Sequence, residues 1–105
     1  MTSKYLLKIA PKAQQAIEER ASYIEEQSSP FAAQFYVSGL YAFIDKHLSH
    51  NPYIYQSRED LKAGLNLRIA YYKKTTAIIY IVEESSKIVI VTGIRHTREN
   101  YINNI

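Results

Sequence analysis

Residues 77–92 read AIIYIVEESSKIVIVT, and this stretch decides the fold. It contains two apolar runs, 77–82 and 87–92, that are rich in the β-branched residues favoured in strands. The polar residues 83–86 between them have the length of a hairpin turn. Because both runs are apolar almost throughout, we expect them at central positions of a sheet that is covered on one face by helices.

Two further strands are predicted outside this hairpin. Residues 65–71 (LNLRIAY) alternate between apolar and polar positions, as a half-buried strand does. Residues 53–64 before them are mixed and polar, and we interpret them as a connecting loop. Near the start of the chain, residues 5–9 (YLLKI) form a short apolar run that ends at Ala10-Pro11, which predicts the first strand.

Two helices are predicted between the first strand and the loop. Pro11 suits the first turn of the first helix, in which apolar residues recur at helical spacing: Ala13, Ala16, Ile17, Ala21 and Ile24. Ser29 and Pro30 suit the N-cap and first position of the second helix. Its apolar stripe is Ala33, Tyr36, Val37, Leu40, Ile44 and Leu48, and it ends before Asn51-Pro52. So short a turn predicts an antiparallel helical hairpin.

The order of these elements predicts a single α+β domain over residues 1–105. We expect an N-terminal strand, then an antiparallel helical hairpin packed on one face of a mainly antiparallel sheet of about four strands. Residues 97–104 are expected to form a short C-terminal helix or a tail.

Composition excludes several classes of protein. The chain has no cysteine, which excludes thiol catalysis, a thiolate zinc site and a disulfide framework. His47 and His50 have a spacing compatible with a metal, but no third ligand accompanies them, and the glycines are isolated. We therefore expect no metal and no cofactor. Without a long apolar stretch or a signal-peptide core, we expect a cytoplasmic protein that does not enter the membrane.

The positive charge is distributed unevenly. Residues 1–52 carry five Lys/Arg and five Asp/Glu, whereas residues 53–105 carry eight and five, so the whole net charge of +3 lies in the C-terminal half. Such an asymmetry suits an anionic partner, either a nucleic acid or an acidic protein segment. An ordinary solvated surface is the alternative.

Residues 95–101 (RHTRENY) bring together two arginines, a histidine and a tyrosine. Arginine binds phosphate or carboxylate oxygens bidentately, and histidine can transfer protons near neutral pH. RNA cleavage needs a base, an acid and a cation beside the phosphate. Tyr101 or His96 could act as the base and Arg95 as the cation. The simpler interpretation is a polar strand end.

The chain contains ten tyrosines, which raises the possibility of a surface on which bases stack. Tyr71, Tyr72, Lys73 and Lys74 interleave aromatic and basic residues in the way such a surface would. A structural role in the core is expected for three tyrosines in helix or strand registers: Tyr36, Tyr41 and Tyr80.

Short motifs occur in a characteristic order over nearly the whole chain. They are residues 9–13 (IAPKA), then Ile17, Tyr23 and Ile24, residues 32–35 (AAQF), Asn51-Pro52, residues 58–61 (REDL), Leu67-Arg68, Ile79-Tyr80 and residues 94–99 (IRHTRE). In order and spacing they resemble the RelE/ParE superfamily of bacterial toxins from type II toxin–antitoxin modules. The resemblance implies a growth-inhibiting toxin that an antitoxin, often helical and acidic, wraps and neutralises in a hetero-oligomer.

The superfamily divides by target into RelE-like and ParE-like members, and this chain resembles each group in part. RelE-like members cut mRNA on the ribosome with strand lysines and arginines and a C-terminal tyrosine, which would make Arg68, Arg95, His96 and Tyr101 catalytic here. ParE-like members lack most of those residues and poison DNA gyrase. Two expected cations are replaced by Ala70 and Ala77, and residues 96–99 look like the ParE-type ending. We therefore favour ParE-like binding of gyrase over mRNA cleavage.

The predicted surface for the target or antitoxin is the set of basic and aromatic residues Arg58, Arg68, Tyr71, Lys73, Lys74, Arg95, His96 and Arg98. A third hypothesis, outside the toxins, is a basic interaction module with no lethal activity.

Overall fold

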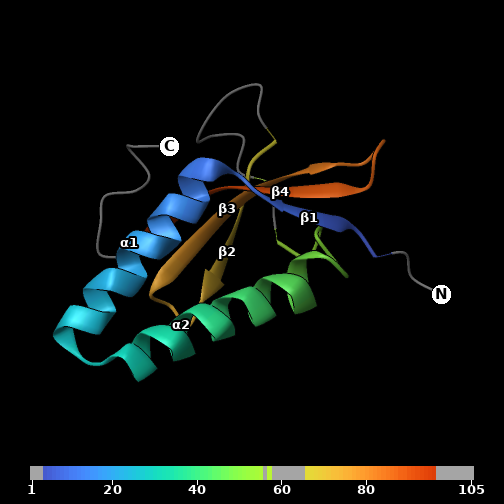
Figure 1. Cartoon of the computed structure of the whole chain (residues 1–105). Coiled ribbons are helices and arrows are strands. Elements are labelled where there is room, and N and C mark those ends of the chain that lie inside the picture. Colours follow the sequence, from blue (N-terminus) through green and yellow to red (C-terminus); the bar gives the residue numbers. More distant parts are fainter. Residues whose placement is uncertain (1–3, 56, 58–65, 97–105) are drawn as a thin grey trace.

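A computed structural model describes residues 4–55, 57 and 66–96 (Figure 1). Its elements, in chain order, are β1 (Leu6–Ile9), α1 (Pro11–Gln27), α2 (Pro30–Phe43), the π-helical turn η1 (Ile44–Leu48), β2 (Arg68–Tyr72), β3 (Thr76–Glu83) and β4 (Ile88–His96). The predicted α+β order is confirmed. The possible C-terminal helix or tail, from residue 97 onward, lies outside the described residues. No helix in the described part of the chain is long and apolar enough to cross a membrane.

The four strands form one sheet in the order β1-β4-β3-β2, so the two strands of the 77–92 hairpin are central, as predicted. β2, β3 and β4 pair in antiparallel fashion, whereas β1 pairs parallel to β4. The sheet is therefore mixed, with antiparallel pairing predominating. The parallel pairing follows from the helical hairpin, which carries the chain away from β1 before the remaining strands form.

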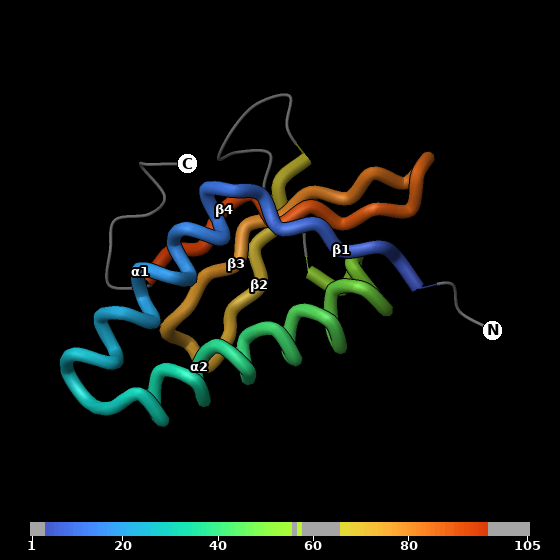
Figure 2. Tube along the Cα trace, viewed as in Figure 1, coloured from blue at the N-terminus to red at the C-terminus, as the bar shows by residue number. Residues whose placement is uncertain are grey.

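The helical hairpin covers one face of the sheet (Figure 2). Ile17 of α1, Leu40 of α2 and Tyr80 of β3 are each at most 1% exposed within a single cluster. Burying such a side chain stabilises the fold by about 1.5–3 kcal/mol. The Tyr80 hydroxyl donates a hydrogen bond to the Pro52 carbonyl oxygen at 2.7 Å, so its polar end is satisfied in the core.

Local signals set where the second helix begins and how closely it packs. The Ser29 hydroxyl oxygen accepts a hydrogen bond from the Ala32 amide at 3.0 Å, which confirms Ser29 as the N-cap. Farther along α2, a Cβ placed on Gly39 would lie 3.3 Å from Cζ of Tyr72 and closer still to its hydroxyl. Gly39 thus lets the Tyr72 ring of β2 reach the helix backbone.

A β-bulge in β4 decides which way its last side chains point. Ile79 pairs with Gly93 and Tyr80 pairs with Val91, so Thr92 is the extra residue. Its hydroxyl donates to the Ile79 carbonyl oxygen at 3.3 Å. Because of this extra residue, the alternation of side chains between the two faces of the sheet shifts by one position after the bulge.

The opposite face of the sheet carries a smaller apolar cluster. Leu67, Ile69, Ala77 and Ile79 are each at most 6% exposed, and Ile81 packs against them. β2 and β3 are therefore buried on both faces, which explains the nearly unbroken apolar run at 77–82.

The β2–β3 turn has an unusual backbone. Lys73 and Lys74 have φ values of 53° and 63°, and the Thr75 amide bonds to the Tyr72 carbonyl oxygen at 3.2 Å. Asn and Gly adopt such positive φ values more readily than lysine does. A left-handed conformation costs a residue with a Cβ about 1–2 kcal/mol.

An exposed polar network holds the β3–β4 turn against the start of the chain. The Tyr5 and Tyr53 hydroxyls donate to Glu84 Oε1 at 2.8 and 2.6 Å, and the Lys87 ammonium pairs with the same carboxylate. These bonds, with Lys87 foremost, lower the pKa of Glu84 to about 2. The bond to Glu84 in turn raises the pKa of Tyr53 to about 12.

Candidate functional site

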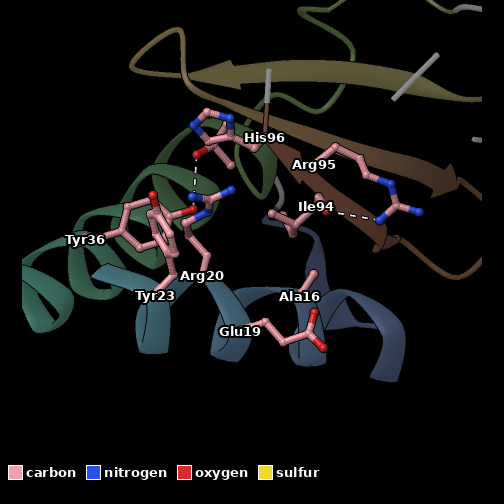
Figure 3. Close-up of a pocket in the computed structure, with 9 residues that line it drawn as sticks. Ala16, Glu19, Arg20, Tyr23, Tyr36, Ile94, Arg95 and His96 are labelled. Carbon is pink, nitrogen blue, oxygen red and sulfur yellow. Dashed lines mark hydrogen bonds between the residues drawn. The ribbon is translucent and has the colours of Figure 1, made fainter. Parts of the chain in front are cut away.

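A pocket of about 760 Å³ opens between the helical hairpin and the adjoining ends of β3 and β4. Figure 3 shows the side chains around it, drawn from both helices and from the end of the sheet. Its lining residues are Ala16, Glu19, Arg20, Tyr23, Tyr36, Thr76, Ile94, Arg95 and His96. The pocket therefore includes the first two residues of the predicted cluster at 95–101.

The inner wall of the pocket carries a pair of hydroxyl groups. The Tyr36 hydroxyl of α2 lies 3.1 Å from the hydroxyl oxygen of Thr76, which is 2% exposed. Burial raises the pKa of Tyr36, against the opposing effects of the Thr76 hydrogen bond and the positive charge of Arg20. Tyr36 therefore remains a neutral hydroxyl near neutral pH, able to donate or accept a hydrogen bond but unsuited to act as a base.

Arg20 and His96 give the pocket its basic character. The Arg20 guanidinium lies 5.1 Å from the centre of the Tyr23 ring, a cation–π contact that orients it. His96 pairs with Thr76 at the last position of β4, so it faces the helices. Glu19 is the acidic residue of the lining, and it adds a carboxylate at the rim. The arrangement suits an anionic group, such as a carboxylate or a phosphate, whose oxygens accept hydrogen bonds.

Arg95 borders the same pocket, but its side chain lies on the face of the sheet opposite the helices. It pairs with Ala77, and its Nη1 donates to the Ile94 carbonyl oxygen at 3.1 Å. Figure 3 shows the guanidinium directed away from Arg20 and Tyr36. Tyr71 pairs with the same Ala77 from β2 and is 42% exposed. Tyr71 and Arg95 therefore flank Ala77 in one row on the face opposite the helices.

Arg68 lies in a different environment. It pairs with Tyr80 on the helix-covered face, about 13 Å along β2 from the pocket end of the strand. Its Nη1 donates to the Tyr55 carbonyl oxygen, and its guanidinium lies 4.8 Å from the Tyr53 ring centre. Its Nε is buried without a hydrogen-bond partner among the described residues. These contacts anchor the chain that follows η1, and they keep Arg68 away from Arg95 and His96.

The other predicted site residues are distributed around the sheet. Lys73 and Lys74 form the β2–β3 turn, and Tyr72 beside them is 7% exposed and belongs to the core rather than to a stacking surface. Arg58, Arg98 and Tyr101 lie outside the described residues.

Of the residues that line the pocket, only Arg95 and His96 were predicted as site residues from the sequence, and Arg20, Tyr36 and Thr76 are the polar ones of the inner wall that were missed. Arg20 follows Ala16 by one helical turn, which places a cation on the otherwise apolar stripe of α1. That irregularity is a signal that sequence reasoning could have used. Tyr36 was assigned to the core, where it does belong in part, and Thr76 gave no signal because a threonine at the start of a strand is ordinary.

The side chains of the pocket are able to bind an anionic group. Hydroxyl groups, a guanidinium and an imidazole can hold oxygens of a carboxylate or phosphate. Within the described ranges, no group of three or more His, Cys, Asp or Glu side chains is arranged to hold a metal ion.

One comparison with known proteins identifies the family, and another identifies similar folds. The family model described as the ParE toxin of the type II toxin–antitoxin system parDE matches residues 7–101. A solved structure of a chromosomal ParDE system from P. aeruginosa matches with a TM-score of 0.73 and 16% identity, over 89% of this chain and 96% of the other.

A toxin–antitoxin complex, RelBE2 from Mycobacterium tuberculosis, matches with a TM-score of 0.61 and 13% identity, over 91% of this chain and 94% of the other. At such identities these structures establish the fold. No curated protein matches significantly. The family match extends over most of the chain, so the chain belongs to the ParE toxins of type II toxin–antitoxin systems, within the RelE/ParE superfamily.

Proposed function

We propose that this toxin inhibits growth by binding DNA gyrase in the cytoplasm, without chemistry of its own, and that a cognate antitoxin neutralises it in a hetero-oligomer. The observation that carries the proposal is the burial of Ala70 and Ala77, both 0% exposed. They occupy the strand positions at which the resemblance to RNA-cleaving relatives leads us to expect a lysine and an arginine.

Two missing cations weaken the case for RNA cleavage. An RNA-cleaving site must stabilise charge that develops on the phosphate, and each lost donor costs such a site about 10²–10³ in rate. Ala77 lies in the row between Tyr71 and Arg95, and Ala70 lies in the core beneath the helices. Neither position offers a cation to a phosphate.

The remaining arginines do not compensate for that loss. Arg68 and Arg95 project from opposite faces of the sheet, so they cannot hold one phosphate together. Arg68 is also engaged with Tyr53 and Tyr55. Arg95, His96, Tyr71, Lys73 and Lys74 are better suited to contact a protein partner, together with Arg58 and Arg98. Among these residues we place the surface that recognises the target or the antitoxin.

The alternative function, ribosome-dependent mRNA cleavage, has one feature in its favour. Arg95 and Tyr101 are spaced like the arginine and terminal tyrosine of RelE-like enzymes. A base at Tyr101 and a cation at Arg95 would then form a reduced active site, whereas Arg68 and His96 lie on the opposite face of the sheet from Arg95. A non-toxic interaction module remains the third possibility, and harmless induced expression would favour it.

Inducible expression in bacteria tests the proposal. We expect a DNA-damage response to precede any fall in protein synthesis, because stalled gyrase breaks DNA before translation stops. Coexpression of the protein encoded by the adjacent reading frame should prevent both effects. Immediate arrest of translation with cleaved mRNA, and no DNA-damage response, would support the RelE-like alternative instead.

A further inference from the structure

The guanidinium of Arg20 lies in the pocket without a counter-charge. Its side chain is half-buried on α1, and the Tyr23 ring supports it, with the ring centre 5.1 Å away. Glu19 also lines the pocket, but its carboxylate points away from Arg20 in Figure 3. In the described part of the chain, no ion pair joins Arg20 to a carboxylate. Because charges that are taken out of water are normally paired, this pocket is suited to receive an anion.

Two hydroxyl groups lie at the inner wall of the same pocket. The Tyr36 and Thr76 oxygens are 3.1 Å apart, so one hydroxyl donates to the other. The hydroxyl that accepts this bond keeps its own hydrogen for a further acceptor. Arg20 is near enough for its charge to oppose the rise in the pKa of Tyr36. An oxygen of a bound anion would therefore meet a guanidinium and a hydroxyl donor together.

The distribution of the donors indicates which kind of anion fits. They come from four elements: Arg20 from α1, Tyr36 from α2, Thr76 from the start of β3 and His96 from the end of β4. A phosphate monoester has three terminal oxygens arranged tetrahedrally, which can accept from donors that converge from several directions. A carboxylate has two oxygens in one plane, which suits a single guanidinium fork. The geometry favours a phosphate group.

The size of the pocket indicates a ligand larger than the phosphate group itself. Its volume of about 760 Å³ is within the range of about 300–1,000 Å³ that is usual for sites of small organic molecules. Ala16, Tyr23 and Ile94 supply apolar and aromatic wall, and Glu19 adds a hydrogen-bond acceptor at the rim. A small organic group that carries hydroxyls, as a sugar does, would contact both kinds of surface.

We propose that this pocket binds a small sugar phosphate, with the phosphate group against Arg20, Tyr36 and Thr76 and the sugar toward Ile94 and Glu19. This inference goes beyond the proposed function, because binding to gyrase needs no small-molecule ligand. The three residues that hold the phosphate are outside the surface assigned to the target or the antitoxin, and only His96 and Arg95 border both.

The test is calorimetric titration of the full-length chain with ribose 5-phosphate at fixed ionic strength. We expect one molecule to bind per chain, at least about tenfold more tightly than ribose, inorganic phosphate or succinate. Ribose lacks the phosphate, inorganic phosphate lacks the sugar, and succinate carries its charge on carboxylates. Absence of saturable binding would overturn the proposal. Equal affinity for inorganic phosphate or succinate would overturn it too, since the pocket would then accept any small anion.

The 5′ end of a nucleic acid strand carries the same phosphate chemistry, so a 5′-phosphorylated oligonucleotide is titrated in parallel. The proposal predicts that ribose 5-phosphate binds by itself and competes for any oligonucleotide bound through its 5′ end. Binding of the oligonucleotide without binding of ribose 5-phosphate would overturn it, because the pocket would then be part of a nucleic-acid surface.

Variants of the pocket test the named contacts. Arg20→Gln removes the guanidinium, and the double variant Tyr36→Phe/Thr76→Val removes both hydroxyls with little change of shape. Each should weaken binding of ribose 5-phosphate by about tenfold or more. The controls are Lys46→Gln, which removes an exposed charge about 15 Å along the helix from Tyr36, and Tyr41→Phe, which removes another hydroxyl of α2. Both should stay within about twofold of the original affinity.

Equal losses in the control and pocket variants would overturn the proposal, because net charge or any tyrosine hydroxyl would then suffice. The melting temperature gives a second measurement. Ribose 5-phosphate should raise it in the original chain and in Lys46→Gln, but not in Arg20→Gln. An equal rise in Arg20→Gln would place the ligand elsewhere and contradict the assignment. The double variant alters different elements, so it decides the question if Arg20→Gln does not fold.

Discussion

Arg68 and Arg95 lie on opposite faces of the sheet, because Arg68 pairs with Tyr80 and Arg95 pairs with Ala77. Tyr80 belongs to the core beneath the helices, whereas Ala77 belongs to the smaller cluster on the other face. The two arginines therefore have separate tasks. Arg68 holds the chain after η1 in place, and Arg95 is available to a partner.

Replacing the two arginines should separate stability from activity. Arg68→Ala removes the hydrogen bond to Tyr55 and the contact with Tyr53, so the free energy of unfolding should fall by about 1–3 kcal/mol. Arg95→Ala loses a hydrogen bond to its own neighbour and should cost less than about 1 kcal/mol. Urea denaturation measures both, and equal losses would contradict the assignment.

The same Arg95→Ala variant should inhibit growth less strongly than the original chain. The guanidinium lies at the end of the sheet, in a row with Tyr71 on a face that the helices do not cover. Its loss should weaken target binding by about tenfold. Colony formation after graded induction measures the effect, and full toxicity with normal expression would show that Arg95 is dispensable.

Gly39 and Tyr72 should be energetically coupled. Alanine normally stabilises a helix by about 1 kcal/mol relative to glycine. At position 39 its Cβ would collide with the Tyr72 phenol, so Gly39→Ala should instead destabilise the protein by about 1–3 kcal/mol. In a Tyr72→Phe background the cost should shrink, because the hydroxyl that the Cβ approaches most closely is gone. Additive effects in this double-mutant cycle would contradict the close approach.

The Glu84 network should make stability depend on acid pH. The folded pKa of Glu84, about 2, is lower than the unfolded value. Its contribution is therefore complete above the unfolded pKa, near 4–4.5, and is lost as pH falls toward 2. Glu84→Gln should flatten the pH dependence of the melting temperature between about pH 5 and 2. An unchanged slope in that range would show that the network contributes nothing.

The same network should also respond to alkaline pH. The pKa of Tyr53 is raised to about 12, mainly by its hydrogen bond to Glu84. A raised pKa means that the contribution is present below the unfolded value near 10 and is lost as pH rises through about 12. Ultraviolet titration of tyrosine ionisation should show several late-titrating groups, because burial also raises the pKa of Tyr36 and Tyr80, and Glu84→Gln should shift only the Tyr53 group toward 10. A titration identical in both proteins would contradict the bond.

Much of the fold could be predicted because local patterns agree with it. The apolar run at 77–82 predicted a central strand, and Ser29 with Pro30 predicted the start of α2; both are confirmed. The parallel pairing of β1 with β4 could not be predicted as directly. Pairing partners depend on how the helical hairpin crosses the sheet, and residues 5–9 alone carry no such information.

The candidate site was less predictable, for two physical reasons. The bulge at Thr92 reverses the alternation of side chains, so Ile94 and His96 face the helices whereas Arg95 faces away. A strict alternation continued from Val91 would have placed Arg95 beneath the helices instead. The left-handed conformations of Lys73 and Lys74 could not be predicted from the sequence either, because lysine has no preference for them.

The central claim, that this chain acts by binding gyrase, is tested most directly by a supercoiling assay with purified gyrase, relaxed plasmid and micromolar toxin. Arg95→Ala and toxin premixed with its antitoxin serve as controls. We predict that the wild-type toxin inhibits supercoiling, that the antitoxin restores it, and that Arg95→Ala inhibits only at higher concentration. Undisturbed supercoiling, together with cleavage of ribosome-bound mRNA by the same preparation, would contradict the claim.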